Sequence, residues 1–413
     1  MHANRGASAN RANPRSTGTN PRSTGTHPRV TLTLRQAQGS KGAPQSRLRA
    51  ALKPPDPLLL APVAFLVALG LVMVFSASSA TAYSAYHDTA HYLKRQAVYL
   101  VVGLIVAYAA YRVDYHKLRK IAPAVVLVAF LLLVLTLIPH VGYATGGARR
   151  WLGLRALSFQ PSEFGKLALV LFLAAKLSSL GEGIRSLSKG VFPALLVTLV
   201  LAIPVLFEPD MGTASLYIFT AFALIFTAGA RIEHLIMCVL VMLPAALIAI
   251  GSSAYKRARI LAFMHPWKDP QNTGFHIVQS LLALGSGGIL GLGLGASRQK
   301  YFYLPEAHTD FIFAVIGEEL GILGALGVLV LFVLFAIRAI TAALRAPDRF
   351  GMLLAMGCTF LIVIQAFINI GVVTASWPVT GVPLPFISFG GSALIVSLIA
   401  VGLIANVGRH RTT

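Results

Sequence analysis

The stretch YFYLPEAHTDFIF, residues 301–313, carries an acidic, histidine-bearing segment directly into a long apolar run. Ionisable side chains at the mouth of an apolar run are costly, and in membrane proteins they commonly line cavities or take part in chemistry. Pro305 suits the first turn of a helix, where its missing N–H is not needed. A helix that begins there places Glu306 and Asp310 on one face. The segment is either the polar cap of a membrane span or a functional site.

The composition is that of a membrane protein. The chain has 413 residues, of which 56% are hydrophobic and 12% charged, and its mean hydropathy is +0.73. Such values predict a protein that crosses the membrane several times. The formal charge of +21 does not indicate nucleic acid, because the basic residues lie in a tail and in short loops, as expected beside anionic lipid. The two cysteines lie in apolar segments and predict neither a disulfide framework nor a metal site.

Residues 1–56 form a polar, basic segment with the tandem repeat NPRSTGT at 13–19 and 20–26. A segment of this composition buries too little apolar area to offset the entropy lost on ordering. We expect a disordered cytoplasmic tail. The tail is not a cleaved signal peptide, because the first apolar run begins late and is long enough to span a membrane.

Ten apolar runs follow the tail, and each is about long enough to cross a bilayer, which takes ~20 residues. We expect an all-α membrane domain over 57–407, with a large extracytoplasmic loop at 251–308 between spans 7 and 8 and a short cytoplasmic C-terminus at 408–413. The predicted spans are 57–79, 96–112, 120–138, 162–178, 191–207, 211–229, 232–250, 309–336, 351–374 and 386–407. With the basic tail inside, the even-numbered turns are cytoplasmic, and each carries Lys or Arg, as the positive-inside rule expects.

The segments on the opposite, outer side hold the unusual polar clusters. They are GARRW at 147–151, QPSE at 160–163 with Lys166 one turn on, EPD at 208–210, KRAR at 256–259, SRQK at 297–300, and the segment 306–310. Exterior Lys and Arg run against the usual bias in charge. An anionic ligand at the outer leaflet would explain them, and phosphate is the natural candidate for several convergent basic groups.

Several of these clusters have two interpretations. Glu163 and Lys166 are three residues apart and can pair within one helix, either to neutralise each other or as part of a site. Glu208 and Asp210 flank a helix-breaking proline and can cap the next helix or belong to a site. Residues 149–151, Arg-Arg-Trp, can anchor the chain at the membrane interface or bind a ligand.

Other motifs point to structure. The glycine-rich stretch 285–296 lacks the strand–helix context of a dinucleotide site, so we expect a re-entrant or surface-lying element packed against protein. Gln365 and Asn369, four residues apart, are read as interhelical hydrogen-bonding groups. Glu318 and Glu319 lie about 12 Å along the eighth span from Asp310, so at least one must face the bundle interior.

Taken together, the motifs resemble the SEDS family (shape, elongation, division and sporulation) of bacterial cell-wall polymerases. The resemblance covers about residues 57–407, and 297–308 is more similar to division members than to elongation members. It is carried by ARRW at 148–151, FQPSEF at 159–164, EPDMGT at 208–213, QSLLALGSGG at 279–288, YLPEAHTDFIFAVIGEELG at 303–321 and PLPFISFGGS at 383–392.

This resemblance implies a glycosyltransferase that polymerises lipid II into glycan strands at the outer face of the bacterial cytoplasmic membrane. It implies partnership with a class B penicillin-binding transpeptidase and other divisome proteins at the septum. The family's proposed catalytic aspartate matches Asp310. The donor is an α-linked sugar pyrophosphate and the product is β-linked, so one inverting displacement suffices, with Asp310 as base.

The remaining site residues are predicted from their place in the matching stretches and on the outer side. Substrate-binding candidates are Arg149, Arg150, Lys166, Arg298, Glu306 and His308. Supporting candidates are Glu163, Glu208, Asp210, Gln279 and Ser388. A divalent cation, Mg²⁺ or Mn²⁺, could share the stabilisation of pyrophosphate. Competing interpretations are a lipid II flippase, a non-catalytic scaffold for a transpeptidase, and an elongation-type polymerase.

Overall fold

The structure is a computed structural model that describes residues 54–145, 148–154, 157–251, 254–301 and 304–410. The description below concerns these residues, which belong to one compact unit. The predicted disorder of the N-terminal tail therefore falls, up to residue 53, outside the described residues. The described part begins with a cap, since the side chain of Asp56 accepts a hydrogen bond from the Leu58 amide (3.0 Å) at the start of the first helix.

Each of the ten predicted apolar runs coincides with a helix. They are α1 (Pro57–Tyr86), α2 (His91–Arg112), α3 (Tyr115–Leu137), α4 (Pro161–Ser179), α5 (Phe192–Phe207), α6 (Met211–Thr227), α7 (Ile232–Gly251), α10 (Ile312–Leu344), α11 (Arg349–Val373) and α12 (Gly391–Arg409). Short turns η2 (Gly181–Arg185) and η3 (Leu187–Val191) lead into α5. Seven helices of the described part are long and apolar enough to cross a membrane. The chain is a mainly helical, multi-pass membrane protein.

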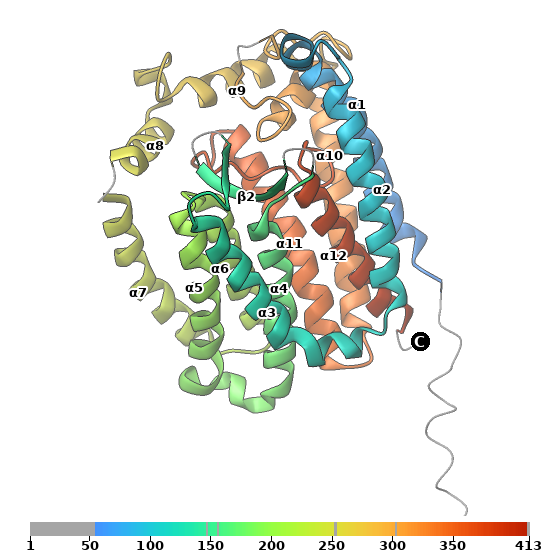
Figure 1. The fold of residues 1–413 in the computed structure, drawn as a ribbon, viewed down its shortest axis with the longest axis vertical. Coiled ribbons are helices and arrows are strands. Elements are labelled where there is room, and N and C mark those ends of the chain that lie inside the picture. The colour runs from blue at the N-terminus through green and yellow to red at the C-terminus, as the bar shows by residue number, and fades with distance from the viewer. Residues whose placement is uncertain (1–53, 146–147, 155–156, 252–253, 302–303, 411–413) are drawn as a thin grey trace, which may run out of the picture. The chain divides into compact units, whose positions relative to one another are not determined.

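Burial separates an inner from an outer set of helices (Figure 1). The most apolar stretch of α11 is 72% buried, whereas that of α2 is 17% buried. Helix α11 packs against α4, α6, α10 and α12. The exposed side chains of α2 and α3 are largely Val, Leu and Ile, which suits contact with lipid chains.

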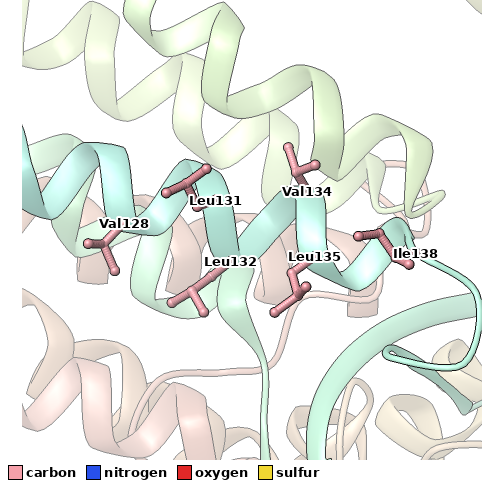
Figure 2. A pocket seen from close by; sticks show the side chains of 6 residues that line it. All are labelled: Val128, Leu131, Leu132, Val134, Leu135 and Ile138. Atoms are coloured by element: carbon pink, nitrogen blue, oxygen red, sulfur yellow. The ribbon is translucent and has the colours of Figure 1, made fainter.

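A shallow hollow of about 360 Å³ runs along α3 (Figure 2). It is lined by aliphatic side chains alone, those of Val128, Leu131, Leu132, Val134, Leu135 and Ile138. These side chains offer no partner to a sugar or a phosphate, and hydrocarbon is the material that fits them. We therefore place no chemistry there.

The ends of the helices are joined by hydrogen bonds at the side of the bundle where the basic loops lie. Arg349 donates from Nη2 to the Ala228 carbonyl (2.6 Å) and from Nη1 to the Gly181 carbonyl (3.4 Å). Arg409 donates to the Tyr111 carbonyl (3.0 Å). The Tyr115 hydroxyl at the start of α3 donates to Asp348, just before α11. The loops after α2, α4, α6 and α10 thus share one end of the bundle with the last turn of α12.

The prediction of an all-α chain is wrong between α3 and α4. This connection forms a small antiparallel sheet in the order β1 (Tyr143–Thr145), β2 (Ala148–Leu154) and β3 (Leu157–Phe159). In the register, Leu152 lies opposite Phe159 and Tyr143 opposite Trp151. Strands β1 and β3 have three residues each, too few to show an alternating pattern. The seven residues of β2, ARRWLGL, do not alternate between polar and apolar, so the sequence offered no strand signal here.

The long loop between α7 and α10 contains helices of its own. They are α8 (Ala254–Met264), a 3₁₀ turn η4 (Pro266–Lys268) and α9 (Phe275–Ser286). Helix α9 packs against α10 and lies at the same end of the bundle as the start of α10 (Figure 1). This is the end opposite the basic loops.

The glycine-rich segment after α9 packs into a break in α10, as the prediction of an element packed against protein required. Gly321 has φ +67° and interrupts the helix. The Leu292 and Gly293 amides donate to the Glu318 and Glu319 carbonyls (3.0 Å each). A Cβ added at Gly291 would stand 2.2 Å from the Glu319 carbonyl oxygen, so only glycine permits this approach.

Glu318 and Glu319 are both buried, which confirms that at least one faces the interior. Glu319 accepts hydrogen bonds from the Ser76 hydroxyl (2.7 and 2.8 Å) and from Lys300 Nζ (3.3 Å). Glu318 accepts from the Ser297 hydroxyl (2.5 Å) and the residue 298 amide (3.0 Å). The two carboxylates therefore fasten the end of the long loop to α1 and α10.

Candidate functional site

The segment 304–311 lies outside any helix, so the prediction that Glu306 and Asp310 share one helical face is wrong. Helix α10 begins only at Ile312. Glu306 has φ +52°, in the left-handed region that a helix excludes. The chain instead makes a turn closed by the hydrogen bond from the Thr309 amide to the Glu306 carbonyl (3.1 Å).

The reason lies in three successive carbonyl groups, those of residues 308–310. In a helix each would accept an amide four residues on. Here the first accepts from the Phe389 amide (2.9 Å), the second from the Ser388 hydroxyl (2.5 Å) and the third from Asn369 Nδ2 (2.7 Å). Partners from α11 and from the loop before α12 therefore replace the helical ones.

The loop of residues 377–390, between α11 and α12, forms the wall that faces Asp310. A Cβ built on Gly381, which has φ +73°, would stand 3.5 Å from Asp310 Oδ2. The other side of the loop packs on the start of α6, because a Cβ on Gly212 would stand 2.6 Å from the Thr380 carbonyl oxygen. Asp310 thus sits where α6, the 377–390 loop and the start of α10 meet.

The Asp310 carboxylate accepts no hydrogen bond and forms no ion pair within the described part of the chain, and the residue is half-buried. Loss of solvation is the main cause that raises its pKa to about 7, and the negative charges of Glu306 and Asp210 add to the effect. Arg150 and Arg259 oppose it. A carboxylate with a pKa near the working pH is suited to accept a proton.

The two acids between α5 and α6 differ in their roles. Asp210 accepts from the Thr213 amide (2.9 Å) and hydroxyl (2.9 Å) at the start of α6, so the capping interpretation holds for it. Glu208 is buried beside the Thr136 hydroxyl, which donates to it. Burial raises the pKa of Glu208 to about 8, so this side chain is largely neutral at pH 7.

Arg150 connects the sheet to this turn. Its Nε donates to the Glu208 carbonyl (2.9 Å) and its Nη2 to the Pro209 carbonyl (2.8 Å). The side chain of Arg150 therefore points toward the acidic turn between α5 and α6, while that of Arg149 is exposed. The guanidinium fixed in this way contributes a positive charge to the surroundings of Asp310.

Lys166 and Glu163 form the self-neutralising pair that was one of their two interpretations. The Nζ of Lys166 lies 2.7 Å from Glu163 Oε1, and both side chains are buried. Gln365 Oε1 accepts a second hydrogen bond from the same Nζ (2.9 Å), and Gln365 Nε2 donates to the Pro383 carbonyl (2.8 Å). The pair thereby supports the 377–390 loop from behind.

Glu306 is exposed, and its carboxylate accepts from the Thr309 hydroxyl (2.8 Å). His308 is buried beside Tyr92, with ring centroids 4.5 Å apart, and beside Phe389 at 5.8 Å. Burial lowers the pKa of His308, so the imidazole is neutral at pH 7. Its packing fixes the turn that precedes Asp310.

Two predicted residues lie apart from these contacts. Arg298 is exposed, and its amide binds Glu318, which places it with the buried Glu318 and Glu319 cluster. Gln279 lies half-buried on α9, and its side chain makes no hydrogen bond within the described residues. The structure brings neither of them into contact with Asp310.

The sequence comparison with known families decides the kind of protein. Residues 57–413 match the FtsW/RodA/SpoVE family, described as cell cycle protein. The chain belongs to this family. Stage V sporulation protein E of Bacillus subtilis is 44% identical over 356 residues, which are 86% of this chain and 97% of that protein. The probable peptidoglycan glycosyltransferase FtsW of Geobacter metallireducens is 43% identical over 85% of this chain and 94% of its own.

Solved structures of similar chains agree with the FtsW/RodA/SpoVE assignment. One, from a peptidoglycan synthase complex that couples polymerization and crosslinking, has a TM-score of 0.71 at 32% identity and covers 86% of this chain and 98% of its own. Another is an aspartate-to-alanine mutant of the rod shape determining protein RodA of Thermus thermophilus. Its TM-score is 0.65 at 31% identity, with 87% of this chain and 99% of that chain covered.

Three residues of this family member's site were missed in the sequence. Arg259 lies within KRAR, and its Nη1 donates to the Val379 carbonyl (3.4 Å). Its place in an exterior basic cluster was a usable signal. Gln365 and Asn369 were predicted to be hydrogen-bonding groups between helices, which is confirmed for Gln365, because its Oε1 accepts from Lys166 of α4. Both side chains also bind carbonyl groups of loops, which was not predicted. Spacing alone cannot distinguish these two kinds of partner.

No group of three or more His, Cys, Asp or Glu side chains that could hold a metal ion exists among the described residues. The acids around Asp310 are engaged elsewhere, Asp210 in a helix cap and Glu306 with Thr309. The donor set that the protein presents is thus smaller than an all-protein metal site requires. A divalent cation held jointly with substrate phosphate stays a prediction.

Proposed function

We propose that the chain is a peptidoglycan glycosyltransferase that polymerises lipid II at the outer face of the cytoplasmic membrane, with Asp310 as its base. The observation that carries this proposal is the Asp310 carboxylate. It is half-buried and has no hydrogen-bonding partner in the described part of the chain, its pKa is about 7, and basic side chains lie nearby. Family membership and the names of the relatives support the same reaction.

The reaction is a single displacement. A hydroxyl of the acceptor sugar attacks the anomeric carbon of the donor, and Asp310 takes the hydroxyl proton as the new carbon–oxygen bond forms. The bond from the anomeric carbon to the pyrophosphate oxygen breaks, and its electron pair leaves with the lipid pyrophosphate. Arg150 and Arg259 are placed to offset the developing negative charge, since both already act on Asp310.

The expected roles of the other basic residues change accordingly. Lys166 is already neutralised by Glu163 and held by Gln365, so we assign it to support of the site. Arg298 belongs to the cluster around Glu318, so we no longer place it on pyrophosphate. Arg149 remains a candidate for contact with the substrate, because its side chain is exposed.

The finer topology is part of the proposal. We infer ten spans, a cytoplasmic N-terminus and C-terminus, and an outward-facing Asp310. Support comes from the bundle end opposite to Asp310, where the basic loops and the C-terminus meet through Arg349 and Arg409. A cytoplasmic position suits this basic end.

We further propose a role in septum formation together with a class B penicillin-binding transpeptidase. The FtsW names of several relatives support the division role, and a structural relative comes from a peptidoglycan synthase complex. The alternative of an elongation-type polymerase keeps the same chemistry and differs in the partner. The two roles are distinguished by measuring, in a purified system, whether the division transpeptidase or the elongation transpeptidase stimulates polymerisation by this chain.

The test is glycan-strand formation from purified lipid II by the full chain with its cognate transpeptidase. Wild type should form polymer, and Asp310→Asn should be slower by roughly 10²-fold or more, the usual scale for an acid–base group. Asp269→Asn is the matched control, because Asp269 is an acid of the same loop whose side-chain hydrogen bonds stay within residues 269–273.

Polymer at the normal rate from Asp310→Asn would remove this residue from the mechanism. Absence of polymer from the wild type, together with lipid II movement across liposome membranes, would identify a flippase. If the chain were a non-catalytic scaffold, any polymer would be made by the transpeptidase preparation alone. Substitution of Asp310 would then leave the rate of polymer formation unchanged.

A further inference from the structure

Asn369 is a buried polar residue of α11 that lies behind Asp310. Its Nδ2 donates one hydrogen bond to the carbonyl of Asp310 (2.7 Å) and a second to the carbonyl of Val382 (2.8 Å). The orientation of this amide is fixed by its partners, because a reversed amide would set its oxygen against two carbonyl oxygens. One side chain thus holds both the catalytic turn and the loop that faces it.

Stability alone does not account for an asparagine here. Its Oδ1 is buried and has no hydrogen-bonding partner among the described residues, and leaving a buried acceptor unpaired costs stability. What asparagine adds is two donors on one short, rigid side chain, at the point where two irregular segments meet.

The attachment matters because of how Asp310 is held. Its carboxylate has no hydrogen bond of its own in the described part of the chain, so its position follows from the backbone. The backbone there is non-helical, and Ser388 and Phe389 hold the carbonyls of the two preceding residues only. The carbonyl of Asp310 itself is held by Asn369.

We propose that Asn369 is the positioning residue of the catalytic base. By binding both carbonyls it sets the distance between Asp310 and the 377–390 loop, whose Gly381 faces the Asp310 carboxylate. The inference rests on the proposed function of Asp310. A base misplaced by about 1 Å can cost on the order of 10²-fold in rate, so loss of Asn369 should lower kcat more than it changes KM.

Two variants remove the donors in different ways. Asn369→Leu keeps most of the volume and offers no donor. Asn369→Asp keeps the shape, but in the protonated form that burial favours it offers a single O–H donor and cannot hold both carbonyls. Both should lower kcat for glycan formation about 10- to 100-fold with KM for lipid II changed less than about threefold. Phe367→Leu is the control, because Phe367 is exposed on the same helix.

A second measurement does not depend on activity. In the full chain, hydrogen exchange of peptides covering 304–311 and 380–384 should be faster in both variants than in wild type and in Phe367→Leu. Peptides from the middle of α11 should exchange as in wild type.

The outcomes separate the two proposals. Unchanged exchange in 304–311 and 380–384, or faster exchange with unchanged kcat, would overturn the positioning role and leave the proposed function intact. A fall in kcat matched by equal loss of folded protein, or by an equal rise in KM, would also overturn it. Absence of polymer from the wild type would overturn the proposed function, and the exchange result would still decide whether Asn369 holds the two segments.

Discussion

Asp310, the proposed base, is half-buried in surroundings that oppose its ionisation. Burial and the acids Glu306 and Asp210 raise its pKa to about 7, while Arg150 and Arg259 limit the rise. A base works in its ionised form, so the rate should rise with pH through this value and level off above it.

The neighbours of Asp310 should move this pH dependence in opposite directions. Glu306→Gln removes a negative charge, so the pKa of Asp310 falls and the acidic limb of kcat/KM moves to lower pH. Arg150→Gln removes a positive charge and moves the limb to higher pH. Each shift should be on the order of half a unit. Glu233→Gln, at an exposed acid at the start of α7, should leave the limb in place, and shifts of one sign in both variants would contradict this account.

The raised pKa also predicts a stability cost. The folded-state pKa of Asp310, about 7, exceeds its ordinary value of 3.8, so the folded protein loses stability as pH rises through about 4 to 7. Asp310→Asn avoids this loss. Its thermal unfolding midpoint in detergent should exceed that of wild type by a few degrees at pH 8 and match it near pH 4. A variant less stable than wild type at pH 8 would show that the carboxylate is stabilised by contacts that we have not identified.

At the scale of elements, the long loop is fastened by buried charge. Lys300 and Glu319 lie 3.3 Å apart with almost no exposure, and Ser76 of α1 donates to the same carboxylate. Glu319 lies two residues before the break in α10 at Gly321, which the backbone of the glycine-rich segment fills. A buried ion pair of this kind holds the loop in one position relative to α1 and α10. Removing either charge leaves the other buried without a partner.

The pair should therefore respond to substitution in a non-additive way. Lys300→Met leaves Glu319 buried without a counter-charge and should destabilise the chain by about 3–5 kcal/mol. Lys300→Met combined with Glu319→Gln removes the uncompensated charge and should recover most of this loss. The comparison is made on unfolding of wild type, both single variants and the double variant in the same detergent. A double variant as unstable as the sum of the singles would contradict the pairing.

The break in α10 also shows what sequence patterns can and cannot predict. The apolar periodicity and lengths located all ten long helices, because each is set by its own residues. Pro305 suggested an early start for α10, but the carbonyls of 308–310 bind partners some 60 to 80 residues away, such as Asn369. Hydrogen bonds to these distant partners keep residues 308–310 out of the helix. The pattern of neighbouring residues in the sequence carries no information about such partners.

At the scale of the whole molecule, the candidate site was predicted in part. The exterior clusters named Asp310, Glu306, Asp210 and Arg150, and these act on one another electrostatically. Arg298 was grouped with them only because it lies on the same predicted side. The side of the membrane on which a residue lies follows from the topology, whereas its contacts depend on how the helices pack. The sequence therefore could not show that Arg298 lies away from Asp310.

The proposed orientation can be tested with two exposed positions at opposite ends of the bundle. In a chain with Cys238 and Cys358 replaced by Ala, Asn272→Cys should react with a membrane-impermeant maleimide in intact spheroplasts. Ser188→Cys should react only after the membrane is opened. Both residues are exposed, so lack of access within the protein does not explain a difference. The reverse pattern would place Asp310 inside the cell.

The most direct test of the central claim is the pH dependence of glycan formation by wild type and Asp310→Asn, measured from pH 5.5 to 8.5 with saturating lipid II. If Asp310 is the base, the wild-type rate rises with pH through about 7 and levels off above it, and the slow residual rate of Asp310→Asn lacks this rise. An Asp310→Asn variant that keeps both the wild-type rate and its pH dependence would show that another group accepts the proton.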